Sequence, residues 1–251
     1  MSLLEVIDYS ALLAREATEV QKLVRVSSNQ GLFFLDLGES RKEAVVADQQ
    51  AIIEAQRKFF AQEPEQKLLF SSDLDEDGYD CHDEVHVQTL KLSRGQQLDG
   101  TLNLPVPIRP VEAEISKLAT MTDDILRQLS TLLCESLDPP ISTEVVSDSR
   151  KPGRSNMCLG LASAAAGTSL MEHHVDSDLL TLTFYDEPFL EVQQPKTGEW
   201  KVVDVCENRP IVNVGTTFQR VSEHRLRAPL HGVRQSEREI NLIMYDLYAC
   251  A

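Results

Sequence analysis

The pattern of hydrophobic and polar positions in the first 140 residues is mainly helical. A short strand pattern covers Leu4–Tyr9, and Ser10 is expected to cap the helix that follows it. An apolar run bounded by glycines, Gly31–Gly38, predicts a buried strand. Two longer helices are predicted at Arg41–Gln62 and Pro110–Leu137, the second with one continuous apolar face.

From about Asn156 the pattern changes to short segments that alternate or are continuously apolar, separated by turn residues such as Pro195–Gly198. The six predicted strands are Leu179–Asp186, Phe189–Gln194, Trp200–Val205, Pro210–Gly215, Leu230–Val233 and Glu239–Tyr248. Half a dozen short strands at this spacing predict an antiparallel sandwich or barrel. Helices followed by a strand cluster indicate an α+β protein with its helices packed outside a β core.

Composition and charge narrow the functional classes. The chain has 251 residues, of which 42% are hydrophobic and 25% charged, as is typical of a globular protein with a sizeable core. We expect one domain over residues 1–251, with a helix-rich part at 1–140 and a β core at 150–251. A net charge of −16 argues against a nucleic-acid partner.

The sequence does not predict a membrane-bound or secreted protein. No segment approaches the roughly 18 apolar residues of a membrane span, and the acidic start of the chain does not resemble a signal peptide. Five scattered cysteines without CxxC spacing are typical of reduced thiols. We therefore expect a soluble, cytoplasmic protein, and the sequence leaves its oligomeric state open.

Candidate metal chemistry lies at the start of the first predicted strand of the β core. Residues two apart in an extended chain point to the same side, so His174 and Asp176 present an imidazole and a carboxylate together. This pair suits Fe(II), which two histidines and one carboxylate bind while leaving positions open for other ligands. The second histidine must come from downstream, where His224 and His231 are the candidates. His173 should face away, toward solvent or a carboxylate.

Several short motifs follow this pair in a fixed order. They are His174-Val175-Asp176, Leu180-Thr181-Leu182, Gly198-Glu199-Trp200, Val212-Asn213-Val214-Gly215 and a segment that ends on His231. In this order they resemble the isopenicillin N synthase-like group of Fe(II)- and 2-oxoglutarate-dependent dioxygenases. His231 follows His174 by 57 residues, an interval that this group also shows. Upstream matches at Val6–Asp8, Gly31–Phe34 and Gly78-Tyr79 extend the resemblance over nearly the whole chain.

This resemblance implies a fold and a metal site. The fold would be a double-stranded β-helix, a jelly roll with the N-terminal helices packed outside it. The ligands of Fe(II) would be His174, Asp176 and His231. His224 is the weaker candidate because it occupies a position where the group usually has glycine.

The resemblance also implies a co-substrate site, with departures. Arg238 matches the arginine that binds a carboxylate of 2-oxoglutarate, and Asn156 matches another residue of that site. Ile240 stands where the group has a serine, and Met157 and Cys158 stand where it has aromatic residues. These departures leave open a 2-oxoglutarate-independent Fe(II) oxidase of the isopenicillin N synthase type.

By resemblance, we expect an oxygenase that uses Fe(II), 2-oxoglutarate and O2. It would oxidise a small, natural-product-type substrate by hydroxylation, desaturation or cyclisation. A non-catalytic binding protein on the same fold is a further alternative, disfavoured by the complete set of three ligands. The aromatic candidates for a position near the site are Phe184, Phe189, Phe218 and Tyr245.

An acidic segment, Asp73–Glu84, matches the EF-hand expression and suggests a rival hypothesis, a calcium-binding protein. Asp80 occupies a position that is normally apolar, and a strand pattern rather than a helix follows Glu84. No second loop accompanies the segment. We therefore interpret it as a solvated acidic loop.

Overall fold

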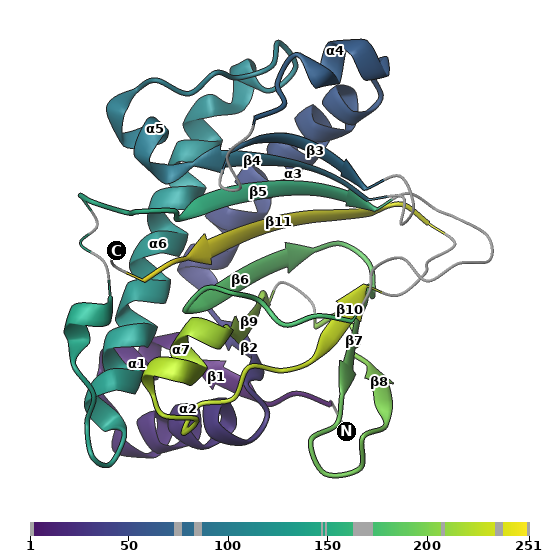
Figure 1. The fold of residues 1–251 in the computed structure, drawn as a ribbon. Coiled ribbons are helices and arrows are strands. Elements are labelled where there is room, and N and C mark those ends of the chain that lie inside the picture. The colour runs from purple at the N-terminus through teal and green to yellow at the C-terminus, as the bar shows by residue number, and fades with distance from the viewer. Residues whose placement is uncertain are drawn as a thin grey trace.

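The computed structural model describes residues 3–72, 77–82, 87–146, 148, 150–162, 173–206, 209–233 and 238–249. Within these residues the strands form two sheets, one of eight strands in the order β1-β2-β9-β6-β11-β5-β4-β3 and one of three in the order β10-β7-β8 (Figure 1). The strands are β1 Val6–Asp8, β2 Leu32–Asp36, β3 Gly78–His82, β4 Val87–Ser93, β5 Asn156–Ala162, β6 Leu180–Tyr185, β7 Leu190–Gln193, β8 Trp200–Val202, β9 Ile211–Val214, β10 His231–Val233 and β11 Ile240–Leu247. The α-helices are α1 Tyr9–Leu13, α2 Ala17–Asn29, α3 Glu39–Phe60, α4 Pro64–Leu68, α5 Arg94–Asp99, α6 Glu112–Ser136 and α7 Thr216–Val221, and short 3-10 turns cover Arg109–Val111 and Thr143–Val145.

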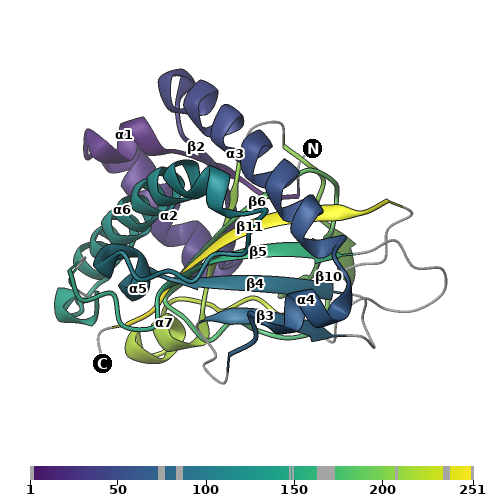
Figure 2. The same ribbon diagram turned by 90° about the horizontal axis from the view of Figure 1, so that it is seen from above.

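Helices cover one face of the large sheet, and a cavity lies on its other face. The long helices α3 and α6 pack on the central strands from one side (Figure 2). Along β11, the side chains of Ile243, Tyr245 and Leu247 belong to the core beneath these helices. The alternate side chains of Met244 and Asp246 line the cavity. The period of two along the strand thus separates a structural face from a functional one.

The predicted fold class is confirmed. The architecture is α+β, with a jelly-roll core of two sheets and helices outside it, and each of the six predicted strands of that core is present as β6 to β11. The predicted long helices correspond to α3 and α6. The apolar face predicted for α6 is buried, because it packs against α3 and the strands β6 and β11.

The N-terminal helix differs from the prediction. It is divided into α1 and α2, and the break lies at Arg15, whose φ is 54°. The residue that caps α1 is Asp8 rather than Ser10: its Oδ1 accepts hydrogen bonds from the backbone N–H groups of Ser10 at 2.8 Å and Ala11 at 3.1 Å. A carboxylate directly before the first turn satisfies these otherwise unpaired donors and interacts favourably with the helix dipole.

The described part of the acidic segment is neither the curled loop of an EF-hand nor the solvated loop expected from the sequence. Gly78–His82 is strand β3, which pairs with β4 in an antiparallel register that sets Asp80 opposite Thr89. An extended strand cannot bring alternating side chains around one cation, so the calcium hypothesis fails for these residues. Residues 73–76 and 83–86 lie outside the described part of the chain.

Two further expectations concern membranes and thiols. Among the described helices, none combines the length and the apolar character that crossing a bilayer requires. Cys81, Cys134, Cys158 and Cys206 are free thiols, whereas Cys250 lies outside the described residues.

Candidate metal centre and its cavity

A backbone pairing brings two distant histidines together. His174 and His231 form an isolated antiparallel bridge in which each backbone N–H donates to the other's carbonyl, at 2.9 and 3.0 Å. His231 begins β10, the edge strand of the small sheet, which pairs with β7 on its other side. The bridge therefore adds His174 to the edge of the small sheet. Residues paired in this way carry their side chains on the same face. The two imidazole rings therefore lie 4.5 Å apart between centroids.

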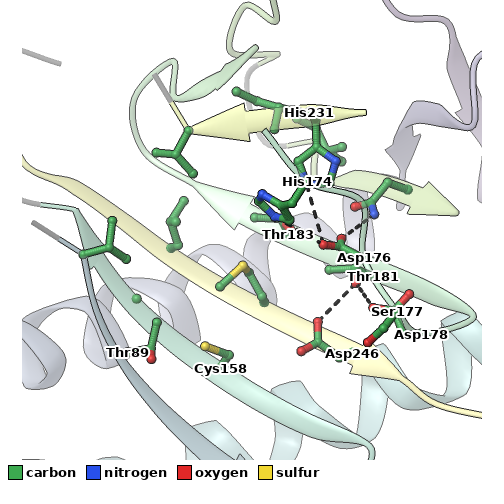
Figure 3. Close-up of a pocket in the computed structure, with 18 of the residues that line it drawn as sticks. Thr89, Cys158, His174, Asp176, Ser177, Asp178, Thr181, Thr183, His231 and Asp246 are labelled. Atoms are coloured by element: carbon green, nitrogen blue, oxygen red, sulfur yellow. Dashed lines mark hydrogen bonds and ion pairs between the residues drawn. The ribbon is translucent and has the colours of Figure 1, made fainter. Parts of the chain in front are cut away.

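Asp176 completes a group of three candidate ligands. Its Oδ1 lies 3.5 Å from His174 Nε2 and 3.7 Å from His231 Nε2. One ligand atom of each residue lies within 4.8 Å of the others, and Figure 3 shows the three side chains pointing toward one another. The structure thus brings together the three residues that the resemblance identified.

Asp176 is held in place from two elements, its carboxylate from β9 and its backbone carbonyl from α7. Asn213 Nδ2 donates to Asp176 Oδ2 at 2.6 Å, which leaves Oδ1 facing the histidines. The backbone N–H and the hydroxyl of Thr216 both donate to the Asp176 carbonyl, at 2.7 and 3.0 Å. Gly215 allows this approach, because a Cβ there would lie 2.2 Å from the carbonyl oxygen of Asp178.

The Val-Asn-Val-Gly motif therefore has a structural role that its sequence pattern alone did not disclose. It places the amide of Asn213 and the start of α7 against the candidate ligand Asp176. The orientation follows from the β6–β9 register, which pairs Thr181 with Asn213.

The electrostatics of the group suit a cation. Burial acts to raise the pKa of Asp176, but the His174 imidazole, the charge of His231 and the Asn213 amide together lower that pKa to about 2. Burial lowers the pKa of His231 below its ordinary value, only partly opposed by the carboxylate of Asp176. At neutral pH Asp176 is thus a carboxylate, and the imidazole of His231 favours its neutral form. These are the protonation states in which the two side chains bind metals.

A cavity of about 360 Å³ opens beside the three candidate ligands, between the two sheets. Its lining includes residues of β3, β4, β5, β6, β9 and β11 of the large sheet and of β7 and β10 of the small one. Of the four aromatic candidates only Phe189 lines it. Phe184, Phe218 and Tyr245 belong instead to the core shared with the helices.

Two further carboxyl groups share one hydroxyl at one end of the cavity. The hydroxyl of Thr181 lies 2.5 Å from Asp178 Oδ2 and 3.1 Å from Asp246 Oδ1 (Figure 3). A hydroxyl has a single proton to donate, so the two carboxyl groups share one donor. Burial, with the charges of Asp176 and Asp246, raises the pKa of Asp178 well above its ordinary value.

Asp246 is the more readily ionised of the two. Burial and then the charge of Asp176 raise its pKa to about 7. The Thr181 hydroxyl is thus the donor toward both carboxyl groups, and the raised pKa values favour a proton on Asp178 more than on Asp246. Neither acid was singled out in the sequence, because Asp246 stands 70 residues from Asp176 and no local pattern marks it.

The remaining candidate residues lie away from the three ligands. His224 is exposed in the left-handed turn after α7, with a φ of 62°. His173 faces away from the cavity as expected: its Nε2 lies 2.8 Å from Glu191 Oε1 and its ring stacks on Trp200. Asn156 is buried on β5 and hydrogen-bonds to the carboxylate of Asp246.

Arg238 does not lie where its predicted role requires. Its side chain is 77% exposed, it forms an ion pair with Glu187 at 2.9 Å, and it does not line the cavity. The cause is the start of β11 at Ile240, which leaves Arg238 before the strand and outside the space between the sheets. Residues 234–237 lie outside the described part of the chain.

Comparisons with known proteins agree with this geometry. Residues 156–244 match the model of the 2OG-Fe(II) oxygenase superfamily. The chain is 26% identical over 247 residues to the 2-oxoglutarate-dependent dioxygenase frbH of Dothideomycetidae sp., with 92% of this chain and 75% of that protein covered. It is 24% identical over 244 residues to the 2-oxoglutarate-dependent dioxygenase FG08081 of Gibberella zeae, with 92% and 73% covered.

Solved structures show the same fold at low identity. Dioxygenase for auxin oxidation 1 from Arabidopsis thaliana, in its 2-oxoglutarate complex, superposes with a TM-score of 0.79 at 19% identity, covering 99% of this chain and 94% of that one. The dioxygenase for auxin oxidation of rice gives a TM-score of 0.77 at 20% identity, covering 98% and 83%. Enzymes of the matching superfamily are oxidoreductases that use Fe(II) and 2-oxoglutarate, as expected from the sequence. Its core, residues 156–244, thus matches the 2OG-Fe(II) oxygenase superfamily, its relatives are similar to it over most of its length, and the solved structures share its fold.

Proposed function

We propose that His174, Asp176 and His231 bind Fe(II), and that the enzyme uses 2-oxoglutarate and O2 to oxidise a C–H bond of a small, natural-product-type substrate. The outcome would be hydroxylation, desaturation or cyclisation. The observation that carries the proposal is the convergence of two imidazoles and one carboxylate on a single point at the wall of a cavity.

The donor set fits Fe(II). Two neutral nitrogens and one carboxylate oxygen leave half of an octahedral coordination sphere open, as non-haem iron oxygenases require. Cys158 lines the same cavity, but its thiol does not belong to the group of three, and burial raises the pKa of that thiol to about 12. A thiol in this state does not compete for the metal.

The chain's own residues prepare the ligands for binding. His231 Nδ1 lies 3.1 Å from the carbonyl oxygen of Pro229, which can only accept a hydrogen bond. The proton is therefore on Nδ1, and the lone pair of Nε2 faces Asp176 and the metal position. Asn213 donates to Asp176 Oδ2 and so leaves Oδ1 free to face the metal position. When bound, Fe(II) with 2-oxoglutarate would supply the oxidising chemistry, and the cavity would hold the substrate and exclude water.

The relatives support the reaction class, and the cavity supports a small substrate. Two of them are named 2-oxoglutarate-dependent dioxygenases, from Dothideomycetidae sp. and Gibberella zeae. A third is the oxidoreductase vrtI of Penicillium aethiopicum, 23% identical over 264 residues, with 94% of this chain and 60% of that protein covered. The volume of about 360 Å³ suits a small molecule rather than a polymer. We therefore propose a small-molecule partner and no nucleic acid or membrane, in a protein located in the cytoplasm.

The test is an anaerobic titration of the apo-protein with Fe(II) and then 2-oxoglutarate, followed through the visible charge-transfer band of a chelated 2-oxo acid. We expect a saturable band that His174→Ala abolishes. Fe(II) binding without a band would favour a 2-oxoglutarate-independent oxidase. A protein that does not bind Fe(II) would contradict the proposal.

A further inference from the structure

The cavity has two chemically different ends. One end is apolar and is formed by the side chains of Phe189, Leu190, Ile211, Val233 and Leu242. The other end is formed by Ser177, Asp178, Thr181, Asp246 and Tyr248. A substrate bound between them meets hydrocarbon on one side and carboxyl groups on the other.

Asp246 is the carboxylate that faces this space. It lies on the cavity side of β11 in a transverse row with Thr181 on β6 and Asn213 on β9. Asn213 holds the candidate ligand Asp176, and neighbouring strands are about 4.8 Å apart, so the backbones of Asp246 and Asn213 are separated by roughly 10 Å. A small molecule anchored at Asp246 can therefore present a carbon to the metal position.

The polar end has a surplus of hydrogen-bond acceptors. Asp178 is 2% exposed and Asn156 is 1% exposed, and in each the side-chain Oδ1 has no hydrogen-bond partner among the described residues. These two residues flank Asp246 in the fold, one through Thr181 and one through its own hydrogen bond to the carboxylate. Both oxygen atoms are closed to solvent, so a ligand in the cavity cannot contact them, but they make the surroundings of Asp246 rich in acceptors and poor in donors.

The charges around Asp246 favour a cation. Asp246 forms no ion pair within the described part of the chain, although Lys91 on β4 lowers the pKa of its carboxyl. Lys91 is the one lysine or arginine among the described lining residues, against the acidic Asp80, Asp176, Asp178 and Asp246. Bound Fe(II), the Asp176 carboxylate and doubly charged 2-oxoglutarate would together carry a single negative charge. The loaded metal centre would therefore not attract an anion either.

We propose that Asp246 is a substrate-binding residue and that it selects substrates with a protonated amine close to the carbon that is oxidised. This inference rests on the proposed function, because it assigns the substrate of the same site. The ammonium group would donate to the carboxylate of Asp246, which Thr181 and Asn156 hold in place. The apolar part of the substrate would lie against the opposite end of the cavity.

The experiment compares two probes of one carbon skeleton, cyclohexylamine and cyclohexanecarboxylate. Each is titrated anaerobically into the protein loaded with Fe(II) and 2-oxoglutarate, and the shift of the visible band gives the Kd. We expect the amine to bind at least about tenfold more tightly than the carboxylate. Asp246→Asn should remove most of that preference while the band itself still forms, and Asp246→Glu, which keeps the charge, should retain it.

Asp204→Asn is the matched control, since it removes one negative charge at an exposed position outside the cavity lining. It should leave the preference unchanged. Equal binding of the two probes by the unaltered protein, no band shift with the amine, or a preference that survives Asp246→Asn would each overturn the inference. A protein that forms no band at all would instead refute the proposed function, so the two failures are distinguishable.

Discussion

The hydrogen bond from Asn213 to Asp176 offers the sharpest test of how the fold prepares the metal centre. Asn213→Leu keeps the approximate size and shape of the side chain and removes the amide that donates to Asp176 Oδ2 at 2.6 Å. Asn213 is 5% exposed, so water cannot readily replace the lost donor. The carboxylate would lose the hydrogen bond that fixes its Oδ2 and could rotate away from the histidines.

The magnitude follows from the type of bond. A hydrogen bond to a buried charged group contributes about 1.5–3 kcal/mol, and about 1.4 kcal/mol corresponds to a tenfold change in an equilibrium constant. We therefore expect the Kd for Fe(II) to rise about 10- to 100-fold, the range found for residues that orient metal ligands elsewhere. The fold should persist, because leucine at this position faces the cavity rather than the core beneath the helices.

The assay is anaerobic Fe(II) binding, with Co(II) absorption as a spectroscopic report on coordination geometry. Thr217→Val is the matched control: its hydroxyl donates to the carbonyl of Ser177 at 2.6 Å, next to the ligand, without touching Asp176. That variant should bind Fe(II) normally. An Asn213→Leu protein that binds Fe(II) within about threefold of the unaltered protein would refute this account of ligand orientation.

Three further outcomes are expected. His231→Ala should abolish Fe(II) binding measured by calorimetry, whereas His224→Ala should leave the Kd unchanged; the reverse result would exchange their roles. In Arg238→Gln, the Kd for 2-oxoglutarate should stay within about twofold and the free energy of unfolding within about 1 kcal/mol of the unaltered protein, because the ion pair of Arg238 with Glu187 is exposed. A large loss of 2-oxoglutarate affinity would restore the sequence-based role of Arg238. The folded-state pKa of Asp246, about 7, exceeds the ordinary value of 3.8, so the free energy of unfolding falls as the pH rises toward and through 7. The apo-protein should lose about 1.4 kcal/mol of stability between pH 6 and pH 8. Chemical denaturation of Asp246→Asn over the same pH range should show a loss smaller by that amount.

Much of the fold could be predicted because it rests on local periodicity. The strands β6 to β11 and the helices α3 and α6 have hydrophobic patterns long enough to specify their type. The division between α1 and α2 was missed, because it depends on one left-handed residue, Arg15, which no pattern marks. Strand β3 was missed because its acidic sequence has little strand character by itself and is extended through pairing with β4.

The candidate metal site was also predictable only in part. The sequence by itself determined that the side chains of His174 and Asp176 would lie close together, because residues two positions apart in an extended chain share a face. It left two histidines available as the third ligand on spacing alone. Only the tertiary structure decided that His231 pairs with His174 and that Asn213 orients Asp176. Those contacts depend on the register between strands far apart in the chain.

Packing between strands also explains why the sequence pointed to Arg238 and missed Asp246. Arg238 matched a motif but precedes β11 and is exposed, whereas Asp246 matched none and faces the cavity. Where a strand begins and which of its faces is buried are settled by packing against neighbouring strands and helices, not by the residues of the strand alone. The sequence thus specified the elements and the local ligand pair, and the packing of those elements specified the chemistry of the space around them.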